Sequence, residues 1–210
     1  MERQKQQRKH IHEGQKPPGG LRVLEYTQLV AGPYCAKMLA DLGAEVIKIE
    51  DPGSGDEARR RGPFPRDIPH PEQSALFLYL NTNKKGVTLN LHTEAGKALL
   101  RNLIGKVDVL IEDKPPRLWE ELGLSYETLK ELNSQLIMTS ITPFGQTGPY
   151  RDYKAYHLNT FQGSGFGYLT PTGRRDQTGM ERRPLLFGGF LADYYAAVNA
   201  AIATMAAVYA

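Results

Sequence analysis

One carboxylate, Asp193, stands in an unusual setting near the end of the chain. It is the only charged residue in the stretch 184–210, PLLFGGFLADYYAAVNAAIATMAAVYA. If a helix begins near Phe190 or Leu191, Asp193 lies in its first turn, where unpaired backbone N–H groups and the helix dipole favour an anion. The sequence therefore predicts an ionised carboxylate at a helix start.

Apolar neighbours reduce the contact of Asp193 with water. These neighbours are Leu186, Phe187, Phe190 and Tyr194. A carboxylate that stays ionised but is thinly solvated is a better nucleophile than one in bulk water. The other interpretation is structural: Asp193 caps the helix, or it pairs with Arg182 or Arg183. The residues alone leave both roles open.

Other kinds of site chemistry find less support. The five histidines and the single Cys35 show no spacing of metal ligands, so no metal site is predicted. Cys35 falls on or near the buried face of a predicted helix, with no His or Asp close in sequence, which indicates a structural thiol. The run GSGFG at 163–167 lacks the spacing of a nucleotide-binding motif and is predicted to be a flexible loop.

Alternating strand and helix patterns must position these residues. Short apolar runs predict strands at 21–26, 44–50, 86–91, 107–112 and 135–142. Helical periodicity predicts helices at 31–43, 74–81, 93–106 and 125–133, besides the helix of Asp193. In the first of these, one face carries Ala36, Leu39, Ala40 and Leu42. Gly43 ends that helix, and Thr93 is a candidate N-cap of the third. We predict an α/β fold with a Rossmann-like, doubly wound parallel sheet.

Ligands of such sheets bind beyond the carboxyl ends of the strands. The loops expected there are rich in Gly, Pro, Lys or Arg and lie at 27–33, 51–56, 81–86, 113–117 and 143–156. The polar stretch 51–73 is rich in proline and arginine and is predicted to lack regular structure.

Composition divides the chain into a basic arm, residues 1–20, and one domain, residues 21–210. The arm holds five Lys or Arg and two Glu, which accounts for the whole net charge of +3. It has no aromatic residue for base stacking and no apolar face, so we expect a disordered, solvated arm without a nucleic-acid or membrane contact. No secretory signal is visible and a single cysteine cannot form an internal disulfide, which favours a cytoplasmic protein.

The apolar segment 187–210 is long enough to cross a membrane. However, it is rich in Ala and Gly rather than Leu and Ile, and it contains Asn199 and Thr204 as well as Asp193. It also lacks a flanking Lys or Arg on its far side. We therefore expect a buried helix of a soluble protein.

Four motifs follow one another along the chain: VAGP at 30–33, GAEVIKIE with PGSGD at 43–56, NKKGVTLNL at 83–91 and FGQTGPY at 144–150. In this order and combination they resemble the family III CoA-transferases of the CaiB/BaiF type. The resemblance covers residues 20–210 and corresponds to the amino-terminal half of the family. Its members are about twice as long and form interlocked dimers, so it implies a homodimer or a partner chain that supplies the missing half.

The resemblance implies a covalent reaction at Asp193, which matches the family's nucleophilic aspartate. That aspartate attacks an acyl-CoA thioester to give a mixed anhydride. CoA thiolate then forms an enzyme thioester, and a second carboxylic acid collects the CoA. Acyl-CoA and a carboxylic acid would be the substrates, with no permanently bound cofactor.

The resemblance also implies contacts with CoA. A loop that lines the family's active site matches Gln28, Leu29, Val30 and Ala31, and a Lys-x-Tyr pair near the bound CoA matches Lys154 and Tyr156. Some expected contacts differ, since Asp113, Pro115, Glu121, His92 and Asp51 stand where the family often has Asn, Arg or Lys. Acidic residues there would repel the CoA phosphates. Basic residues that could compensate are Lys84, Lys85, Lys114, Arg117 and Arg59 to Arg61.

Three alternatives accompany this hypothesis. Related 2-methylacyl-CoA racemases have a His where this chain has Tyr156, and a tyrosine is too weak an acid for that proton exchange, although His157 is adjacent. A non-catalytic or partial subunit is suggested by Asp113, Glu121 and the missing half. A dinucleotide-dependent oxidoreductase is disfavoured because the glycine fingerprint is absent. Because members of the resembled family are about twice as long, we expect the helix of Asp193 to leave apolar surface unburied and the isolated chain to be poorly soluble.

Overall fold

A parallel sheet forms the centre of the molecule, a computed structural model that describes residues 20–170 and 185–210. The strands are β1 (Arg22–Tyr26), β2 (Glu45–Glu50), β3 (Lys84–Thr88), β4 (Val109–Glu112) and β5 (Ile137–Ser140). They lie in the order β3-β2-β1-β4-β5, and every pairing is parallel. The predicted α/β class is therefore confirmed. Except for Gly20, the predicted arm lies outside the described residues.

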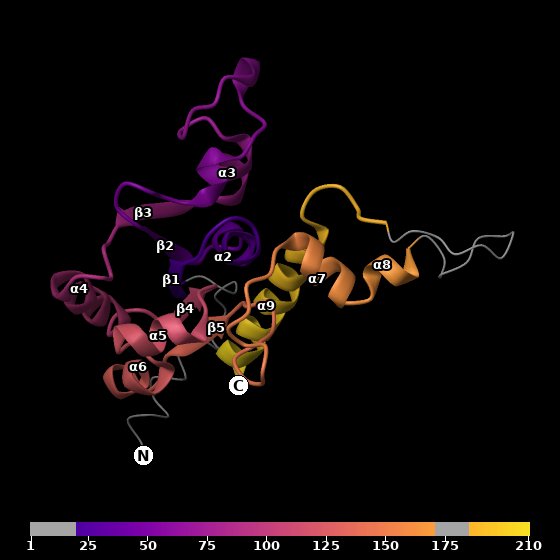
Figure 1. Cartoon of the computed structure of the whole chain (residues 1–210). Helices are drawn as coiled ribbons and strands as arrows, with labels where there is room; N and C mark the ends of the chain where they lie inside the picture. The colour runs from indigo at the N-terminus through magenta and orange to yellow at the C-terminus, as the bar shows by residue number, and fades with distance from the viewer. Residues whose placement is uncertain (1–19, 171–184) are drawn as a thin grey trace, which may run out of the picture.

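Helices cover both faces of the sheet (Figure 1). One face carries α2 (Ala31–Asp41) and α9 (Leu191–Tyr209), and the other carries α4 (Glu94–Ile104), α5 (Pro116–Leu122) and α6 (Tyr126–Leu132). Successive side chains of a strand point to opposite faces, so Val23 packs with α2 and α9 while Leu24 packs with the other group. The central strands β1 and β4 are buried on both faces, as is typical of a parallel sheet, whereas the edge strand β3 is mostly exposed.

Shorter helices connect this framework. They are α3 (Ala75–Leu80), α7 (His157–Gly163), α8 (Phe166–Leu169) and the 3₁₀ turns η2 (Glu57–Arg60) and η3 (Pro65–Asp67). Thr93 caps α4 as predicted, because its hydroxyl accepts the Gly96 N–H at 3.1 Å. Gly43 follows α2 with φ of 106°, a backbone conformation that favours glycine.

Several local predictions were wrong. The third strand begins at Lys84 rather than Gly86, because Lys84 to Thr88 pair with Val46 to Glu50; Leu89 and Leu91 leave the strand and fill the core. The loop predicted at 163–167 is the end of α7 and the start of α8, and the stretch 51–73 contains two 3₁₀ turns. Leu42 lies beyond the end of α2 and is exposed.

Helix α5 was not predicted from the sequence, because adjacent prolines are typical of a loop. In fact Pro115 is its N-cap and Pro116 its first residue, a position that needs no N–H donor. Gly123 ends the helix in the left-handed conformation, with φ of 65°.

Helix α9 packs by one narrow stripe only. Ala197, Ala201 and Thr204 are buried, and the Thr204 and Thr139 hydroxyl groups hydrogen-bond at 2.7 Å between α9 and β5. The opposite face exposes Tyr195, Val198, Ile202 and Tyr209. The expectation of a buried helix is thus wrong for this chain, whereas the expectation of an unburied apolar face is confirmed. Among the described helices, α9 is also the one long and apolar enough to cross a membrane.

Candidate functional site

Asp193 lies in the first turn of α9, as predicted, and it has a partner that the sequence did not reveal. Its Oδ2 lies 2.8 Å from Nδ1 of His157, the first residue of α7. The side chains are 23% and 12% exposed, so water reaches both groups only partly. A histidine and a carboxylate from two helices therefore form one polar pair.

Aromatic rings hold the imidazole of His157 in place. Its ring centroid is 5.8 Å from that of Phe161 and 6.0 Å from that of Phe190. Phe161 is fully buried and also packs against Phe187, at 5.9 Å between centroids. The setting of Asp193 is more open than expected, because Leu186 and Phe187 are both 47% exposed.

Of the two structural roles predicted for Asp193, capping of α9 is wrong. The N-cap of α9 is Phe190, so Asp193 is not the capping residue. Arg182 and Arg183 lie outside the described residues. Within the described ranges, the side-chain partner of Asp193 is His157.

The loop 27–31 lies beyond the carboxyl end of β1 and is fixed by acceptors from other elements. The Gln28 N–H donates to Asp113 Oδ2 at 2.6 Å, and the Leu29 N–H donates to Asp56 Oδ1 at 2.9 Å. These bonds hold Leu29 at φ of 64°, which is strained for a residue with a side chain. Gly32 follows, and a Cβ there would lie 2.3 Å from the Thr27 side chain.

Helix α2, which follows this loop, lies beside the helix of Asp193. The rings of Tyr34, on α2, and Tyr194, on α9, meet edge to face with centroids 4.8 Å apart. Three segments distant in sequence therefore approach one another: the start of α2, the start of α9, and the start of α7 through His157.

A buried cluster of charged side chains holds the loop 27–31 in place. This cluster was not predicted from the sequence. Lys48 Nζ lies 2.9 Å from Glu25 Oε1 and 2.8 Å from Asp56 Oδ2, and it donates to the Thr27 carbonyl at 3.0 Å. Lys84 Nζ pairs with Glu25 Oε2 at 2.8 Å. All four charged side chains are almost fully buried. The signal was present in the sequence, since a Glu and a Lys interrupt the apolar strands at positions that pair in register.

The cluster shifts the pKa values of its members. Burial raises the pKa of Glu25, but the charges of Lys48 and Lys84 outweigh it and lower that pKa to about 2. Burial lowers the pKa of Lys48, but Glu25 and Asp56 outweigh it, so the net shift is upward. For Lys84 burial prevails and lowers the pKa to about 8. Glu25 therefore stays ionised at neutral pH.

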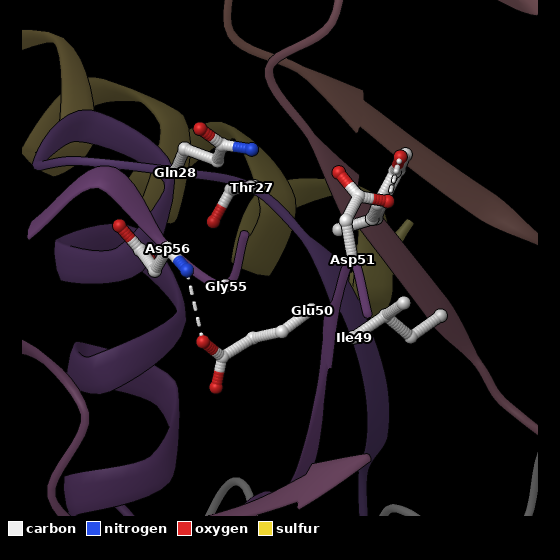
Figure 2. A pocket seen from close by; sticks show the side chains of 8 residues that line it. Thr27, Gln28, Ile49, Glu50, Asp51, Gly55 and Asp56 are labelled. Atoms are coloured by element: carbon white, nitrogen blue, oxygen red, sulfur yellow. Dashed lines mark hydrogen bonds between the residues drawn. The ribbon is translucent and has the colours of Figure 1, made fainter. Parts of the chain in front are cut away.

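A narrow pocket opens where β1 and β2 end. It is lined by Tyr26, Thr27, Gln28, Ile49, Glu50, Asp51, Gly55 and Asp56. Figure 2 shows Gln28, Asp51 and Asp56 around it, with the Asp56 N–H bonded to Glu50. The pocket has no interior space for a water-sized molecule.

The structure distributes the predicted CoA-binding residues over two places. Gln28 lines the pocket, Leu29 and Ala31 are half-buried, and Val30 is buried. Lys114 joins this group, because its Nζ lies 4.7 Å from the Tyr26 ring centroid and 3.4 Å from Asp113 Oδ1. Lys154 and Tyr156 are exposed, just before α7, and the described contacts do not connect them with the loop.

Most of the basic residues that could compensate for the acidic positions already pair with carboxylates of the protein. Lys84 is buried against Glu25, and Arg59 grips both oxygens of Glu50 at 2.7 and 2.8 Å. Arg117 pairs with Glu121 on the surface. Lys85 pairs with Glu45, at the amino-terminal end of β2. Lys114 makes a longer pair with Asp113, at 3.4 Å, and Arg60 donates to the Ser54 carbonyl at 3.4 Å.

The acidic residues that stand at expected CoA contacts have mostly structural roles. Asp113 accepts the Gln28 N–H, and burial raises its pKa. Asp51 accepts the Tyr26 hydroxyl at 3.0 Å, and burial together with this carboxylate raises the pKa of Tyr26. These negative charges are therefore partly offset by hydrogen bonds within the protein.

Comparison with known proteins gives relatives along almost the whole chain. The model of CoA-transferase family III matches residues 19–210. The succinate–glutarate CoA-transferase of Agrobacterium fabrum is 39% identical over 196 residues, which are 92% of this chain and 47% of that protein. The succinyl-CoA–D-citramalate CoA-transferase of Chloroflexus aurantiacus is 39% identical over 201 residues, with 93% and 46% covered.

A solved structure agrees with the sequence relatives. The crystal structure of a CAIB/BAIF family protein from Brucella suis has a TM-score of 0.78 and 37% identity, covering 93% of this chain and 50% of that one. The chain spans about half the length of the curated relatives that it matches.

Proposed function

Because this chain belongs to CoA-transferase family III, we propose that it provides the nucleophile for moving CoA from an acyl-CoA thioester to a carboxylic acid. The observation that carries the proposal is Asp193 itself. It is a partly desolvated carboxylate at the start of a long helix, oriented by His157 and lacking any lysine or arginine partner among the described residues.

The proposed reaction exchanges one activated acyl bond for another. Oδ1 of Asp193 attacks the thioester carbonyl and CoA thiolate leaves, which gives a mixed anhydride. The thiolate then attacks Cγ of Asp193 and expels the first carboxylate, which gives an aspartyl-CoA thioester. A second carboxylate repeats these steps in reverse order and departs as its CoA ester. The overall reaction converts one CoA thioester into another at nearly equal free energy, so the proposed cycle needs no ATP.

CoA binding is proposed along the loop 27–31. Gln28, Leu29, Val30 and Ala31 would contact the arm of CoA that carries the thiol, while Lys114 would meet a phosphate. Lys154 and Tyr156, exposed before α7, would contribute from the other side of the site. The fixed backbone of Gln28 and Leu29 supports this role, because a preformed loop loses little entropy on binding.

Further contacts are proposed to come from outside the described chain. The apolar face of α9 and the narrow pocket both suit a site that is completed by a second copy or by a chain supplying the other half of the relatives' length. A cytoplasmic location and freedom from nucleic-acid or membrane partners belong to the same proposal.

Succinyl-CoA is the first donor to test, since the names of two relatives include succinate or succinyl-CoA. The chain is incubated with succinyl-CoA and ¹⁴C-succinate, alone and together with the carboxyl-terminal half of a relative. We expect radioactivity to enter succinyl-CoA, and the variant Asp193→Asn to abolish it. Exchange that survives in Asp193→Asn would contradict the role of this carboxylate.

A racemase-like activity is the second candidate, and the His157–Asp193 pair favours it. Tyr156 had argued against proton exchange, but His157 is the residue that contacts Asp193. A neutral imidazole can take an α-proton near neutral pH, whereas a tyrosine cannot. In D₂O, a racemase would place deuterium at C2 of a 2-methylacyl-CoA, and a pure CoA-transferase would leave C2 unlabelled.

A further inference from the structure

The contact between His157 and Asp193 fixes where one hydrogen lies. Oδ2 of an ionised carboxylate can only accept, so the bond of 2.8 Å requires the hydrogen on Nδ1 of His157. Nε2 is buried and has no hydrogen-bond partner among the described residues. The imidazole thus aims one N–H at one oxygen of Asp193, and the described bonds leave Oδ1 without a donor.

Two backbone donors of the loop 27–31 are already in use. The N–H groups of Gln28 and Leu29 point to Asp113 and Asp56, so neither is available to an oxygen in the site. Within the described chain, His157 is the side chain that donates to this carboxylate. The packing of its ring against Phe161 and Phe190 keeps the Nδ1–H in that direction.

We infer that the Nδ1–H of His157 stabilises the oxyanion that forms when Cγ of acylated Asp193 is attacked. This inference rests on the proposed function. It assigns one hydrogen-bond donor to the second part of the reaction, in which Cγ of acylated Asp193 is attacked. Before the reaction, the same hydrogen bond holds Oδ2 and presents Oδ1 as the nucleophile. After acylation, Oδ2 is the carbonyl oxygen of Asp193 and keeps the same donor.

The chemical steps balance without any further reactant. In the anhydride, CoA sulfur forms a bond to Cγ while the π electrons of the Cγ–Oδ2 bond move to Oδ2. The negative Oδ2 then accepts a stronger hydrogen bond from Nδ1. The Cγ–Oδ2 double bond reforms, the Cγ–Oδ1 bond breaks, and the acid leaves as a carboxylate with Oδ1. Attack of the second carboxylate on the thioester uses the same oxyanion and expels thiolate.

A matched pair of variants separates donation from packing. His157→Asn keeps an N–H donor near the position of Nδ1, whereas His157→Phe keeps an aromatic ring and removes the donor. Loss of one oxyanion donor typically slows catalysis by about 10²- to 10³-fold. We expect that loss in His157→Phe, with KM for succinyl-CoA little changed, and a much smaller loss in His157→Asn.

The readout is the covalent state of the Asp193 peptide after rapid mixing with succinyl-CoA, followed by quenching and mass spectrometry. In His157→Phe, formation and discharge of the CoA thioester should both slow, and added imidazole should restore them in His157→Ala. The imidazole experiment also serves if His157→Phe fails to fold. Equal rates in the Phe and Asn variants, or no rescue by imidazole, would overturn the inference. If the unchanged protein forms no adduct on Asp193, the proposed function itself fails.

Discussion

Individual charged residues decide both the stability of the site and its chemistry. Asp193 was recognisable in the sequence because nothing else in its neighbourhood is charged. Its partner His157 was not, since the contact joins two helices and has no local pattern. The Glu25–Lys48 pair was not predicted either. The two strands were correctly predicted to be buried, but no role was predicted for the charged residues within them.

The lowered pKa of Glu25 predicts an acid-sensitive fold. The folded pKa of about 2 lies below the unfolded value of 4.5, so this stabilisation is complete above pH 4.5 and is lost as the pH falls towards 2. A difference of this size corresponds to about 3 kcal/mol of unfolding free energy. Urea titrations between pH 5 and pH 2 should show the decline.

The variant Glu25→Gln tests this assignment. It removes the acid-dependent contribution and leaves Lys48 and Lys84 without their shared anion, which should cost about 3–5 kcal/mol at neutral pH. Glu94→Gln is the control, since Glu94 is exposed and makes only a surface pair with Lys97. An unchanged acid decline in Glu25→Gln would refute the role given to Glu25.

Asp113 predicts a contrast between two substitutions. Asp113→Asn keeps an acceptor for the Gln28 N–H and removes a negative charge beside Lys114. It should therefore tighten CoA binding by about 1 kcal/mol, or about fivefold in Kd. Asp113→Ala frees the loop and should weaken binding. Calorimetric titration with CoA measures both, and identical effects would show that Asp113 does not fix the loop.

Secondary-structure elements followed from periodicity where it was strong. The strands and the helices α2, α3, α4, α6 and α9 all lie where apolar spacing predicted them. The errors fall where other physics decides. The register with β2 moves β3 two residues earlier, and proline at a helix start turns an apparent loop into α5. The loop predicted at 163–167 is a short turn between α7 and α8, with Phe166 packed on buried Phe161.

The first turn of α2 depends on a close approach between Gly32 and the Thr27 side chain, which only glycine permits. Gly32→Ala would place a Cβ against Thr27 and force the loop 27–31 to move, at a cost of about 1–3 kcal/mol. Gly105→Ala is the matched control, because its nearest contact would be 3.7 Å and its backbone is helical. Chemical denaturation should show a large loss for the first and little change or a gain for the second.

At the scale of the whole molecule, the described residues leave an apolar surface on α9 uncovered. Helix α9 buries one stripe against α2 and β5 and exposes Tyr195, Val198 and Ile202 on the other side. Continuous apolar surface of this kind promotes association. No pattern in the sequence could locate this surface, because it depends on which face of an almost uniformly apolar helix meets the sheet.

Charge placed on that face should improve the behaviour of the isolated chain. Ile202→Lys is expected to increase the monomeric fraction in size-exclusion chromatography with light scattering, and to leave Tm nearly unchanged. Ala201→Lys is the control on the buried stripe, where an unpaired charge should unfold the protein. Equal Tm values for these two variants would mean that α9 is oriented differently.

The central claim is that Asp193 carries the group that is transferred. The most direct measurement is mass spectrometry of the Asp193 peptide after the protein has reacted with succinyl-CoA and been quenched with hydroxylamine, which converts an acyl-aspartate to its hydroxamate. The account predicts a hydroxamate at Asp193 in the unchanged protein and none in Asp193→Asn. CoA exchange without any modification of Asp193, or modification at another carboxylate, would contradict it.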